Sequence, residues 1–387
     1  MVGGAVGGAA PRTRNSMRLG ALRSHNSALV LDLLRTAGPE GISRLELAER
    51  TGLTPQAVSK ITARLREDGL VAEAGRRAST GGKPRTVLRL VPEAGHAVGV
   101  HLDRDELTAV LCDLTGTVVA QRRAPLDLGA GAETVVERAV REVGELVAGG
   151  GRTGAVLGVG VALPGPLDHR RGVLHRITGF PEWNGFPLRD VLARRLSLPV
   201  VVDKDTNAAA LGLAVGGAAA SGTSFAYLHF GAGLGGGLVI GGAVHRGSRT
   251  AAGEFGHQVV QLDGPPCGCG NRGCVEALCL AAVARGDLAE AARVLGTAAG
   301  NLVALLDVDL VLLGGRTVAG APETFVRGVA AVLEERARRA GGGAVPVRVA
   351  SGGERGERGE RGERRDREVA EGAAQLLLAP LFGRADG

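Results

Sequence analysis

The feature that most constrains this chain is a run of closely spaced cysteines, Cys267, Cys269 and Cys274, with His257 ten residues upstream of the first. Three thiolates and one imidazole form a complete tetrahedral ligand set for zinc. Glycines at positions 268, 270 and 273 allow the backbone to fold tightly around an ion. The set leaves no coordination position open, so we predict a structural Zn2+ site. Three core cysteines without metal are the alternative.

The remaining cysteines, Cys112 and Cys279, have no such neighbours, and we expect them to be buried as small apolar residues. Clustered thiols are typical of metal binding in a reducing compartment rather than of a disulfide framework. No run of about 20 uninterrupted apolar residues occurs, and residues 1–10 lack the features of a signal peptide. We therefore expect a cytoplasmic protein with no membrane partner.

Residues 24–67 carry a helix-turn-helix pattern. Apolar residues at helical spacing begin at Ser24, a short helix is expected at residues 43–50 with Leu45 and Ala48 buried, and Gly52 makes the turn. Thr54 is a good N-cap, and Pro55 suits the first position of a third helix. This helix should bury Val58, Ile61 and Leu65.

The outward face of the third helix is polar and basic, as base edges and phosphates require. Two strands at residues 70–91 should form a wing whose tip is also basic. Arg-rich composition favours a polyanion partner, although a generally Arg-rich chain of net charge +6 explains the charge equally well. A helical dimerisation or linker module is the alternative. The predicted DNA contacts are Thr54, Gln56, Ser59, Lys60, Arg64, Lys83 and Arg85.

Beyond Pro92, strand-like runs alternate with Ala-rich helical stretches, which predicts an α/β body. Strands are expected at 97–100, 107–113, 156–163, 200–202, 225–230, 238–240 and 310–313, and a helix at 369–378. The predicted organisation is a disordered arm at 1–20, a DNA-binding domain at 21–92 and a body at 96–382. Within the body, we expect the Gly-Glu-Arg repeat at 352–367 to form a flexible loop.

Glu254 and His257 lie on one short segment, and Glu276 follows a proposed zinc ligand by two residues. If zinc gathers these segments, the two carboxylates and the imidazole converge, and such a group suits sugar hydroxyls. Solvated surface acids are the alternative.

The segment from Glu254 to His257 and the cysteine run to Glu276 resemble the signature of the ROK family (repressor, open reading frame, kinase). The motifs Leu163–Asp168, Asp203–Asn207, the glycine run 231–237 and Asp309–Gly315 resemble further family motifs. The resemblance covers residues 24–382. It implies a winged helix-turn-helix joined to a two-lobed, actin-like (sugar kinase/ribonuclease H-like) body. The lobes would be about 96–205 with 368–382, and about 206–351.

The resemblance also implies roles for individual residues. Asp205 occupies the place of the catalytic base of family kinases. His257 would bind zinc with one nitrogen and contact sugar with the other. The implied ligand-binding set is Gly165, Lys204, Asp205, Glu254, His257 and Glu276.

The nucleotide-binding half departs from the family pattern. Kinases carry Asp-x-Gly-Gly-Thr after the first body strand, whereas this chain has His101 and the acidic run Asp103–Glu106. We expect these acids to face the phosphate position and to weaken ATP binding. Ala232 replaces a threonine of the second phosphate loop, and Lys204 replaces an asparagine.

Together these patterns predict a transcriptional regulator, expected to be a repressor, that is no longer an enzyme and has no active catalytic residue, with Asp205 a vestigial base. Its partners would be operator DNA, a sugar or sugar derivative, and a second copy of the chain, as a homodimer or a dimer of dimers. An active ATP-dependent sugar kinase that also binds DNA is one alternative. An architectural DNA-binding protein whose body only dimerises is another.

Overall fold

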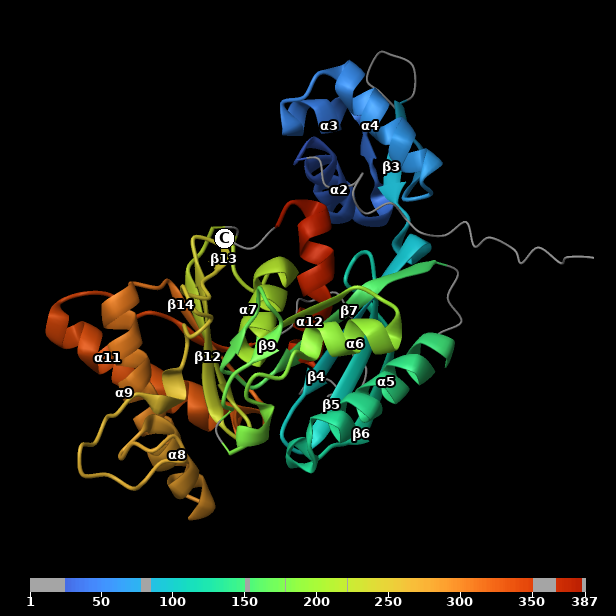
Figure 1. Ribbon diagram of the computed structural model, residues 1–387. Coiled ribbons are helices and arrows are strands. Elements are labelled where there is room, and N and C mark those ends of the chain that lie inside the picture. The colour runs from blue at the N-terminus through green and yellow to red at the C-terminus, as the bar shows by residue number, and fades with distance from the viewer. Residues whose placement is uncertain are drawn as a thin grey trace, which may run out of the picture. The chain divides into compact units, whose positions relative to one another are not determined.

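The structure is a computed structural model that describes residues 25–77, 85–149, 154–177, 179–220, 222–350 and 367–384. The chain divides into a small unit, residues 1–95 with 153–155, and a larger unit made of the rest (Figure 1). The predicted arm at 1–20 and residues 352–366 of the Gly-Glu-Arg repeat lie outside the described residues.

The described residues of the small unit form three helices and a three-stranded antiparallel sheet, the arrangement of a winged helix-turn-helix. The helices are α2 (His25–Ala37), α3 (Arg44–Thr51) and α4 (Pro55–Glu67). The sheet has the order β1-β3-β2, with strands β1 (Ile42–Ser43), β2 (Val71–Arg77) and β3 (Arg85–Leu90). Its core is formed by buried leucines and valines from all three helices and from β3, among them Leu34, Leu47, Val58 and Leu88.

The turn between α3 and α4 is fixed by local hydrogen bonds at the helix ends. Ser43 and Glu46 form a capping box, in which Ser43 N donates to Glu46 Oε2 at 2.8 Å and Glu46 N donates to Ser43 Oγ at 3.3 Å. Gly52 ends α3 with φ of 71°, a left-handed conformation that favours glycine. Thr54 Oγ1 then caps α4 by accepting from Ala57 N at 3.2 Å.

Two expectations for the buried faces are wrong. In α3 the buried residues are Leu47 and Ala48, and Leu45 is 40% exposed. Helical residues rotate by about 100° each, so a face centred on Leu47 turns Leu45 outward. In α4 the buried position is Thr62 rather than Ile61, which is half-buried. The Thr62 hydroxyl can be buried because it donates to Val58 O at 2.9 Å.

The larger unit is built on two five-stranded sheets, β6-β5-β4-β7-β10 and β13-β12-β11-β14-β15. In this direction the strands of both sheets follow the same order along the chain. Each has an antiparallel meander on one side and two parallel strands on the other. The first sheet consists of β4 (Gly95–Leu102), β5 (Glu106–Asp113), β6 (Val118–Pro125), β7 (Ala155–Leu163) and β10 (Val200–Lys204). The second consists of β11 (Phe225–Phe230), β12 (Leu234–Ile240), β13 (Ala243–Val244), β14 (Leu310–Gly314) and β15 (Val347–Val349). We call the parts built on these sheets the first and second lobes.

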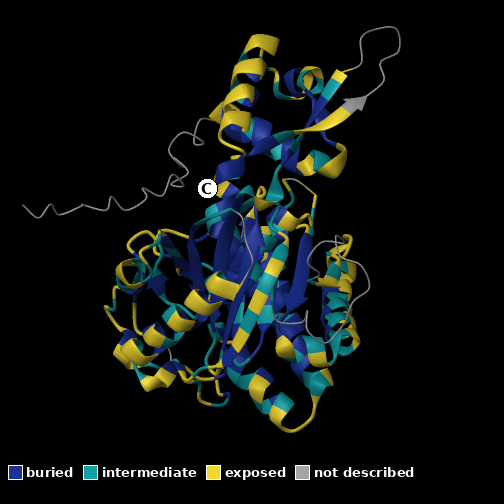
Figure 2. Ribbon diagram, turned by 90° about the vertical axis from the view of Figure 1, so that its right-hand side faces the viewer, coloured by how far each residue is buried: buried dark blue, intermediate teal, exposed yellow. Residues whose placement is uncertain are grey.

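Helices cover both sheets and lie between them. Figure 1 shows α7 (Asp205–Gly216) and α12 (Glu368–Leu378) between the two sheets. The outer face of the first sheet packs on α5 (Ala132–Gly149) and α6 (Leu188–Leu196). The outer face of the second sheet packs on α8 (Val275–Ala284), α9 (Leu288–Leu306) and α11 (Pro322–Ala340). The short helix α10 (Arg316–Gly320) follows β14. A small pair of strands, β8 (Leu167–Asp168) and β9 (Val173–Leu174), follows β7. Figure 2 shows the strands buried and the outer helices exposed on one face.

The elements between the sheets approach one another closely where glycines replace larger residues. A Cβ on Gly99 of β4 would lie 1.9 Å from Ala370 O, and one on Gly160 of β7 would lie 1.8 Å from Ala373 O, both in α12. A Cβ on Gly372 would lie 1.9 Å from Ala208 O in α7. These distances are impossible for a real Cβ, so each position requires glycine.

The predicted strands all occur, and the helix expected at 369–378 is present. Some details differ. The short strands β1, β8, β9, β13 and β15 were not predicted. The strand β6 was also missed, because it is an edge strand whose residues mostly alternate between half-buried and exposed. The strand β12 begins at Leu234 rather than at position 238, because glycines 235–237 belong to the strand. A Cβ on Gly237 would lie 2.1 Å from Thr206 O, so this run allows α7 to lie against the sheet. Among the described residues, no helix is long and apolar enough to cross a membrane.

We predict that Gly372→Ala destabilises the protein by about 1–3 kcal/mol, since the added methyl meets the backbone of α7 rather than a movable side chain. Gly144→Ala in α5 is the matched control, because a Cβ there meets nothing within 4 Å and alanine favours a helix. Thermal unfolding should therefore show a lower midpoint for Gly372→Ala and an unchanged or higher midpoint for Gly144→Ala. Equal midpoints for the two variants would contradict the packing described here.

Candidate functional site

One cavity between the lobes is lined by all six residues predicted to bind a sugar: Gly165, Lys204, Asp205, Glu254, His257 and Glu276. Gly165 follows β7 and Lys204 ends β10, and these two strands are parallel neighbours. Carboxyl ends of adjacent parallel strands meet at one edge of a sheet, where ligands commonly bind. Glu254 and His257 come from the segment after β13, and Glu276 comes from the first turn of α8.

Lys204 spans the cleft from the first lobe to the second. Its side chain is 4% exposed, and Nζ donates to Ala252 O at 2.6 Å and to Glu254 Oε1 at 3.0 Å. A Cβ on Gly165 would lie 2.8 Å from Lys204 Cδ. Gly165 therefore leaves the space through which the lysine stem reaches Glu254.

The neighbouring residue, Asp203, forms a second buried ion pair between the lobes. Arg246 Nε donates to Asp203 Oδ2 at 2.7 Å, with side chains 5% and 2% exposed. The other oxygen of Asp203 accepts from Lys204 N at 2.7 Å and from Asn207 Nδ2 at 3.0 Å. No sequence pattern signals this pair, because its residues lie 43 positions apart.

Asp205 begins α7 at the floor of the cavity. Burial raises the pKa of its carboxyl to about 7, and a hydrogen bond from Thr206 N and the ammonium of Lys204 only partly oppose this effect. A carboxyl with this pKa is divided between its neutral and ionised forms near neutral pH. It can therefore both donate to and accept from a ligand hydroxyl.

The two glutamates of the cavity are held differently. Glu276 is buried, and its Oε2 accepts from Leu234 N at 2.8 Å. A Cβ on Gly233 would lie 2.9 Å from that same oxygen, so glycine is needed beside it. Glu254 is 41% exposed and bonds to Lys204 through one oxygen. With Asp205, the cavity thus presents carboxyl groups from both lobes, an arrangement suited to a polyhydroxy ligand.

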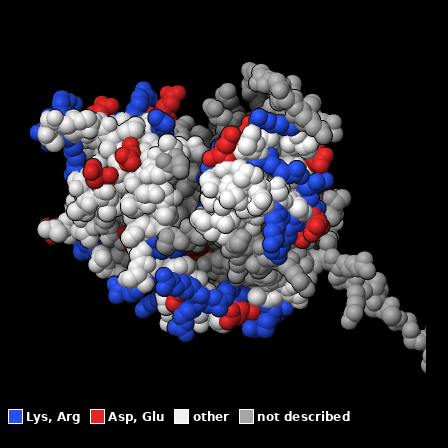
Figure 3. All heavy atoms as spheres, turned by 90° about the horizontal axis from the view of Figure 1, so that it is seen from above, with Lys and Arg blue, Asp and Glu red and all other residues white. Residues whose placement is uncertain are grey.

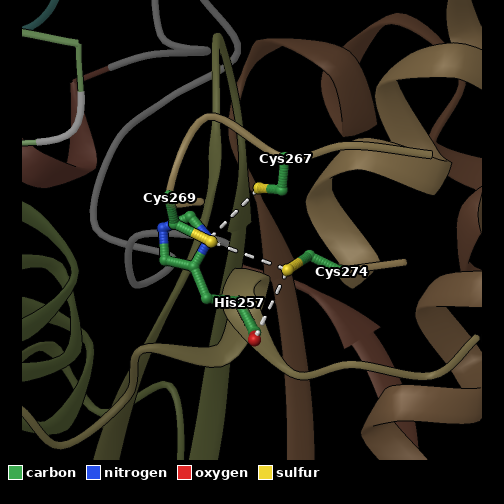
Figure 4. A group of neighbouring side chains, drawn as sticks. All are labelled: His257, Cys267, Cys269 and Cys274. Carbon is green, nitrogen blue, oxygen red and sulfur yellow. Dashed lines mark hydrogen bonds between the residues drawn. The ribbon is translucent and has the colours of Figure 1, made fainter. Parts of the chain in front are cut away.

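Next to the cavity, His257 joins the three cysteines in one cluster (Figure 4). The ligand atoms of His257, Cys267, Cys269 and Cys274 all lie within 4.8 Å of one another. His257 Nδ1 is 3.7 Å from Cys267 Sγ, and Cys269 Sγ is 3.7 Å from Cys274 Sγ. This group could hold a metal ion, and it joins the turn that carries Glu254 to the start of α8, which carries Glu276.

The two remaining cysteines lie away from this cluster. Both are fully buried, and burial raises the pKa of the Cys112 thiol and raises that of Cys279 to about 12. They are therefore protonated and pack as small apolar residues, as predicted.

The turn between β4 and β5 holds the acidic run predicted to oppose phosphate, and the structure corrects part of that prediction. Asp103 and Arg104 line the cavity. Asp105 instead pairs with Arg316 of the second lobe at 3.0 Å, and Glu106 accepts from Thr108 Oγ1 at 3.2 Å. These two carboxylates therefore have partners of their own. The sequence did not reveal the partner of Asp105, because Arg316 is 211 residues away.

Residues predicted to contact DNA lie on the surface of the small unit. Gln56, Ser59, Lys60 and Arg64 are exposed on α4, and Arg85 is exposed at the start of β3. Thr54 is exposed and caps α4, while Lys83 lies outside the described residues. Figure 3 shows Lys and Arg side chains clustered in several places on one face of the molecule, with fewer acidic ones between them.

Comparison with known protein families gives two matches. The ROK family model matches residues 97–286, and a MarR family model matches residues 24–79. A xylose repressor from Bacillus spizizenii is 29% identical over 257 residues, which make up 65% of this chain and 64% of that protein. The chain thus spans a little under two thirds of the length of this curated relative.

Solved structures show the same architecture. A ROK hexokinase from Thermus thermophilus is 30% identical, with a TM-score of 0.57 over 73% of this chain and 97% of that one. A ROK family transcriptional regulator described as a homolog of Escherichia coli MLC is 20% identical, with a TM-score of 0.73 over 94% and 98%. The second comparison confirms the fold of both units in one chain.

We predict that Asp205→Asn removes a pH dependence of stability. The unfolded aspartate ionises near pH 3.8, whereas the folded one keeps its proton to about pH 7, so its contribution to stability is lost as pH rises through that window. Thermal midpoints measured from pH 4 to pH 8 should show the variant gaining on the wild type up to about pH 7, with a constant difference above. A difference that does not vary with pH would refute the raised pKa.

Proposed function

Because the chain belongs to the ROK family, we propose that it is a DNA-binding transcriptional repressor of carbohydrate metabolism that senses a sugar or sugar derivative. One observation carries this proposal. A helix-turn-helix with an exposed polar helix and a cavity lined for a polyhydroxy ligand occur in one chain, while the nucleotide half of that cavity is altered. The relative named a xylose repressor supports the regulatory class, and the identity of the sugar does not follow from it.

The small unit supports DNA binding through α4. Its exposed residues repeat at three- and four-residue intervals, so their side chains lie along one face of the helix. In a helix-turn-helix the second helix enters the major groove, and α4 holds that position after α3 and Gly52. Two copies related by a two-fold axis would read a palindromic operator, as a homodimer or a dimer of dimers.

The cavity supports an effector rather than a substrate. Phosphoryl transfer depends on positioning the phosphates and neutralising their charge. Here Asp103 lines the cavity, the Asp105–Arg316 pair joins the lobes beside it, and His101 stands where the kinases carry an aspartate. Asp205 and the similarity to a hexokinase are what favour the alternative of an active kinase. A coupled ATP-consumption assay with a hexose panel separates the two, since turnover would establish the kinase.

We further propose that the cluster of His257 and three cysteines holds one structural Zn2+. Tetrahedral zinc with Zn–S bonds of about 2.3 Å places its sulfurs about 3.8 Å apart, and the Cys269–Cys274 distance of 3.7 Å fits this value. All four positions are taken by protein ligands, so the ion would have a structural role. His257 would orient its ring between the ion and the cavity, and Cys274 would fix the first turn of α8.

We predict that freshly purified, reduced protein contains about one zinc per chain, and that Cys269→Ser loses the metal and unfolds at a lower temperature. Metal binding and folding are linked, so the loss of one ligand lowers both. Cys112→Ala is the control, since this cysteine is buried elsewhere and should leave the metal content unchanged. Metal analysis that finds no zinc in the wild type would refute the proposal.

We predict that a sugar which binds the protein changes its affinity for DNA from its own upstream region. Fluorescence anisotropy of labelled DNA, titrated with protein in the presence of a panel of sugars, measures the effect. Glu276→Gln should abolish the response to sugar without loss of DNA binding, because it weakens only the cavity. Arg64→Ala should weaken DNA binding about tenfold and reduce its salt dependence.

The control for both variants is Glu323→Gln, which alters an exposed residue of α11 and should behave as the wild type. Sugar binding without any change in DNA affinity would contradict the sensor mechanism. If calorimetry detects no ligand binding to the zinc-loaded body, the result would instead favour an architectural protein whose body only dimerises.

A further inference from the structure

A second cavity, which we call the hairpin cavity, lies between the β8–β9 turn of the first lobe and the β12–β13 hairpin of the second. Its volume is about 410 Å³, and its lining includes His169, Arg170, His245 and Arg246 on the basic side. Ile240 and Val244 form an apolar wall. Of the described residues that line this cavity, none is acidic. None of these residues belongs to the predicted sugar site.

From this lining we propose that the hairpin cavity is a second ligand site, for a small metabolite that carries a carboxylate or phosphate group. Arginine and histidine donors are the side chains that recognise such oxyanions. Arg246 is 5% exposed and fixed by its bond to Asp203, so one donor group at this site is held in place before any ligand arrives. The carbon part of the metabolite would pack on Ile240 and Val244.

The hairpin cavity is linked through two adjacent residues to the cavity lined by Lys204, Glu254 and Glu276, which we call the effector cavity. Successive side chains of a strand point to opposite faces, and Asp203 and Lys204 end β10. Lys204 lines the effector cavity, whereas Asp203 bonds to Arg246, which lines the hairpin cavity. An anion drawn to Arg246 would compete with Asp203 for the guanidinium and would thereby act on the residue beside Lys204.

The loop between the two cavities provides a second connection. His169 Nδ1 lies 2.8 Å from Thr250 Oγ1, and Thr250 has φ of 58°, a conformation that β-branched residues rarely adopt. Two residues later, Ala252 O accepts from Lys204 Nζ, and Ala252 N donates to Arg246 O at 3.1 Å. A change at His169 or Arg246 therefore reaches the bond that holds Lys204. Binding at the two cavities should be coupled, and the coupling must be reciprocal.

Isothermal titration of the full-length, zinc-loaded protein in Tris chloride buffer tests the site, with inorganic phosphate in one arm and succinate in the other. We expect saturable binding of one anion per chain in at least one arm, and the stronger arm identifies the chemistry. Arg170→Ala, which removes an exposed side chain, should weaken that binding at least tenfold. Arg171→Ala is the matched control, since it is the next residue and does not line the cavity. Arg246 is left unchanged, because its removal would leave Asp203 as a buried charge.

Three results would overturn the proposal. The first is the absence of saturable binding in both arms. The second is binding that Arg170→Ala and His245→Ala leave unchanged, which would place the anion elsewhere. The third is anion binding that becomes stronger in Glu276→Gln, since loss of a repelling carboxylate acts on an anion held in the effector cavity. Because this titration requires neither sugar nor DNA, it can succeed where the proposed regulatory function fails, and the reverse.

Coupling has its own readout once a sugar ligand is known. Titration of that sugar with and without the anion should give dissociation constants that differ several-fold in wild type and Arg171→Ala, and that agree in Arg170→Ala. Equal constants in the wild type would refute the coupling through Asp203 and leave the anion site standing.

Discussion

Two adjacent ion pairs join the lobes of the larger unit, one with its anion on β10 and the other with its cation there. Asp203 and Lys204, consecutive on β10, bond to Arg246 and Glu254 of a single segment in the second lobe. Of the two, only the Asp203–Arg246 pair is buried on both sides, and loss of one partner of such a pair costs about 3–5 kcal/mol because the other charge is left buried and unpaired. The segment 246–254 is therefore fixed to the edge of the first sheet, and the position of Glu254 in the cavity follows from that attachment. Beyond Glu254, the chain enters the cluster of His257 and the three cysteines, a group that could hold a metal ion.

The lobes can be joined so closely because the layer between the sheets contains little side-chain volume. Alanines and glycines dominate the contacts of α7 with α12, and Gly99, Gly160 and Gly372 allow backbones to touch. An aromatic content of only 2% fits a body packed in this way, since bulky rings would hold the sheets apart. The ends of β10 and of the segment 246–254 lie on the two sides of this layer, and the ion pairs join them.

Local chemistry was predictable from the sequence, and long-range pairing was not. The cysteine cluster, the Thr54 cap and most strands of the two sheets rest on residues near one another in the chain, and the sequence predicted them, whereas it missed β6, β13 and β15. The pairs Asp203–Arg246 and Asp105–Arg316 join residues 43 and 211 positions apart, and single arginines in an Arg-rich chain carry no pairing signal. The error at Leu45 has a different cause. A two-turn helix has too few residues to define its buried face, and tertiary packing decided it. Glycines 235–237 looked like a loop, and only the backbone of α7 beside them explains why they form a strand.

The ion pairs that join the lobes differ in strength between the two ends of the cleft, the end with the acidic run Asp103–Glu106 and the end with Glu254 and Glu276. The Asp105–Arg316 pair has side chains 59% and 42% exposed, and pairs of this kind contribute about 0–1 kcal/mol. It brings opposite charges together beside the altered phosphate loop, yet it is too weak to lock the lobes. The pairs of Asp203 and Lys204 join the lobes at the other end of the cleft, where Glu254 and Glu276 line the cavity. Lys204 and Glu254 line that cavity and also pair across the lobes, so a ligand bound there would act on one of the contacts that join the lobes. This asymmetry fits the sensor that we propose, because a ligand can change the arrangement of the lobes only through contacts that join them.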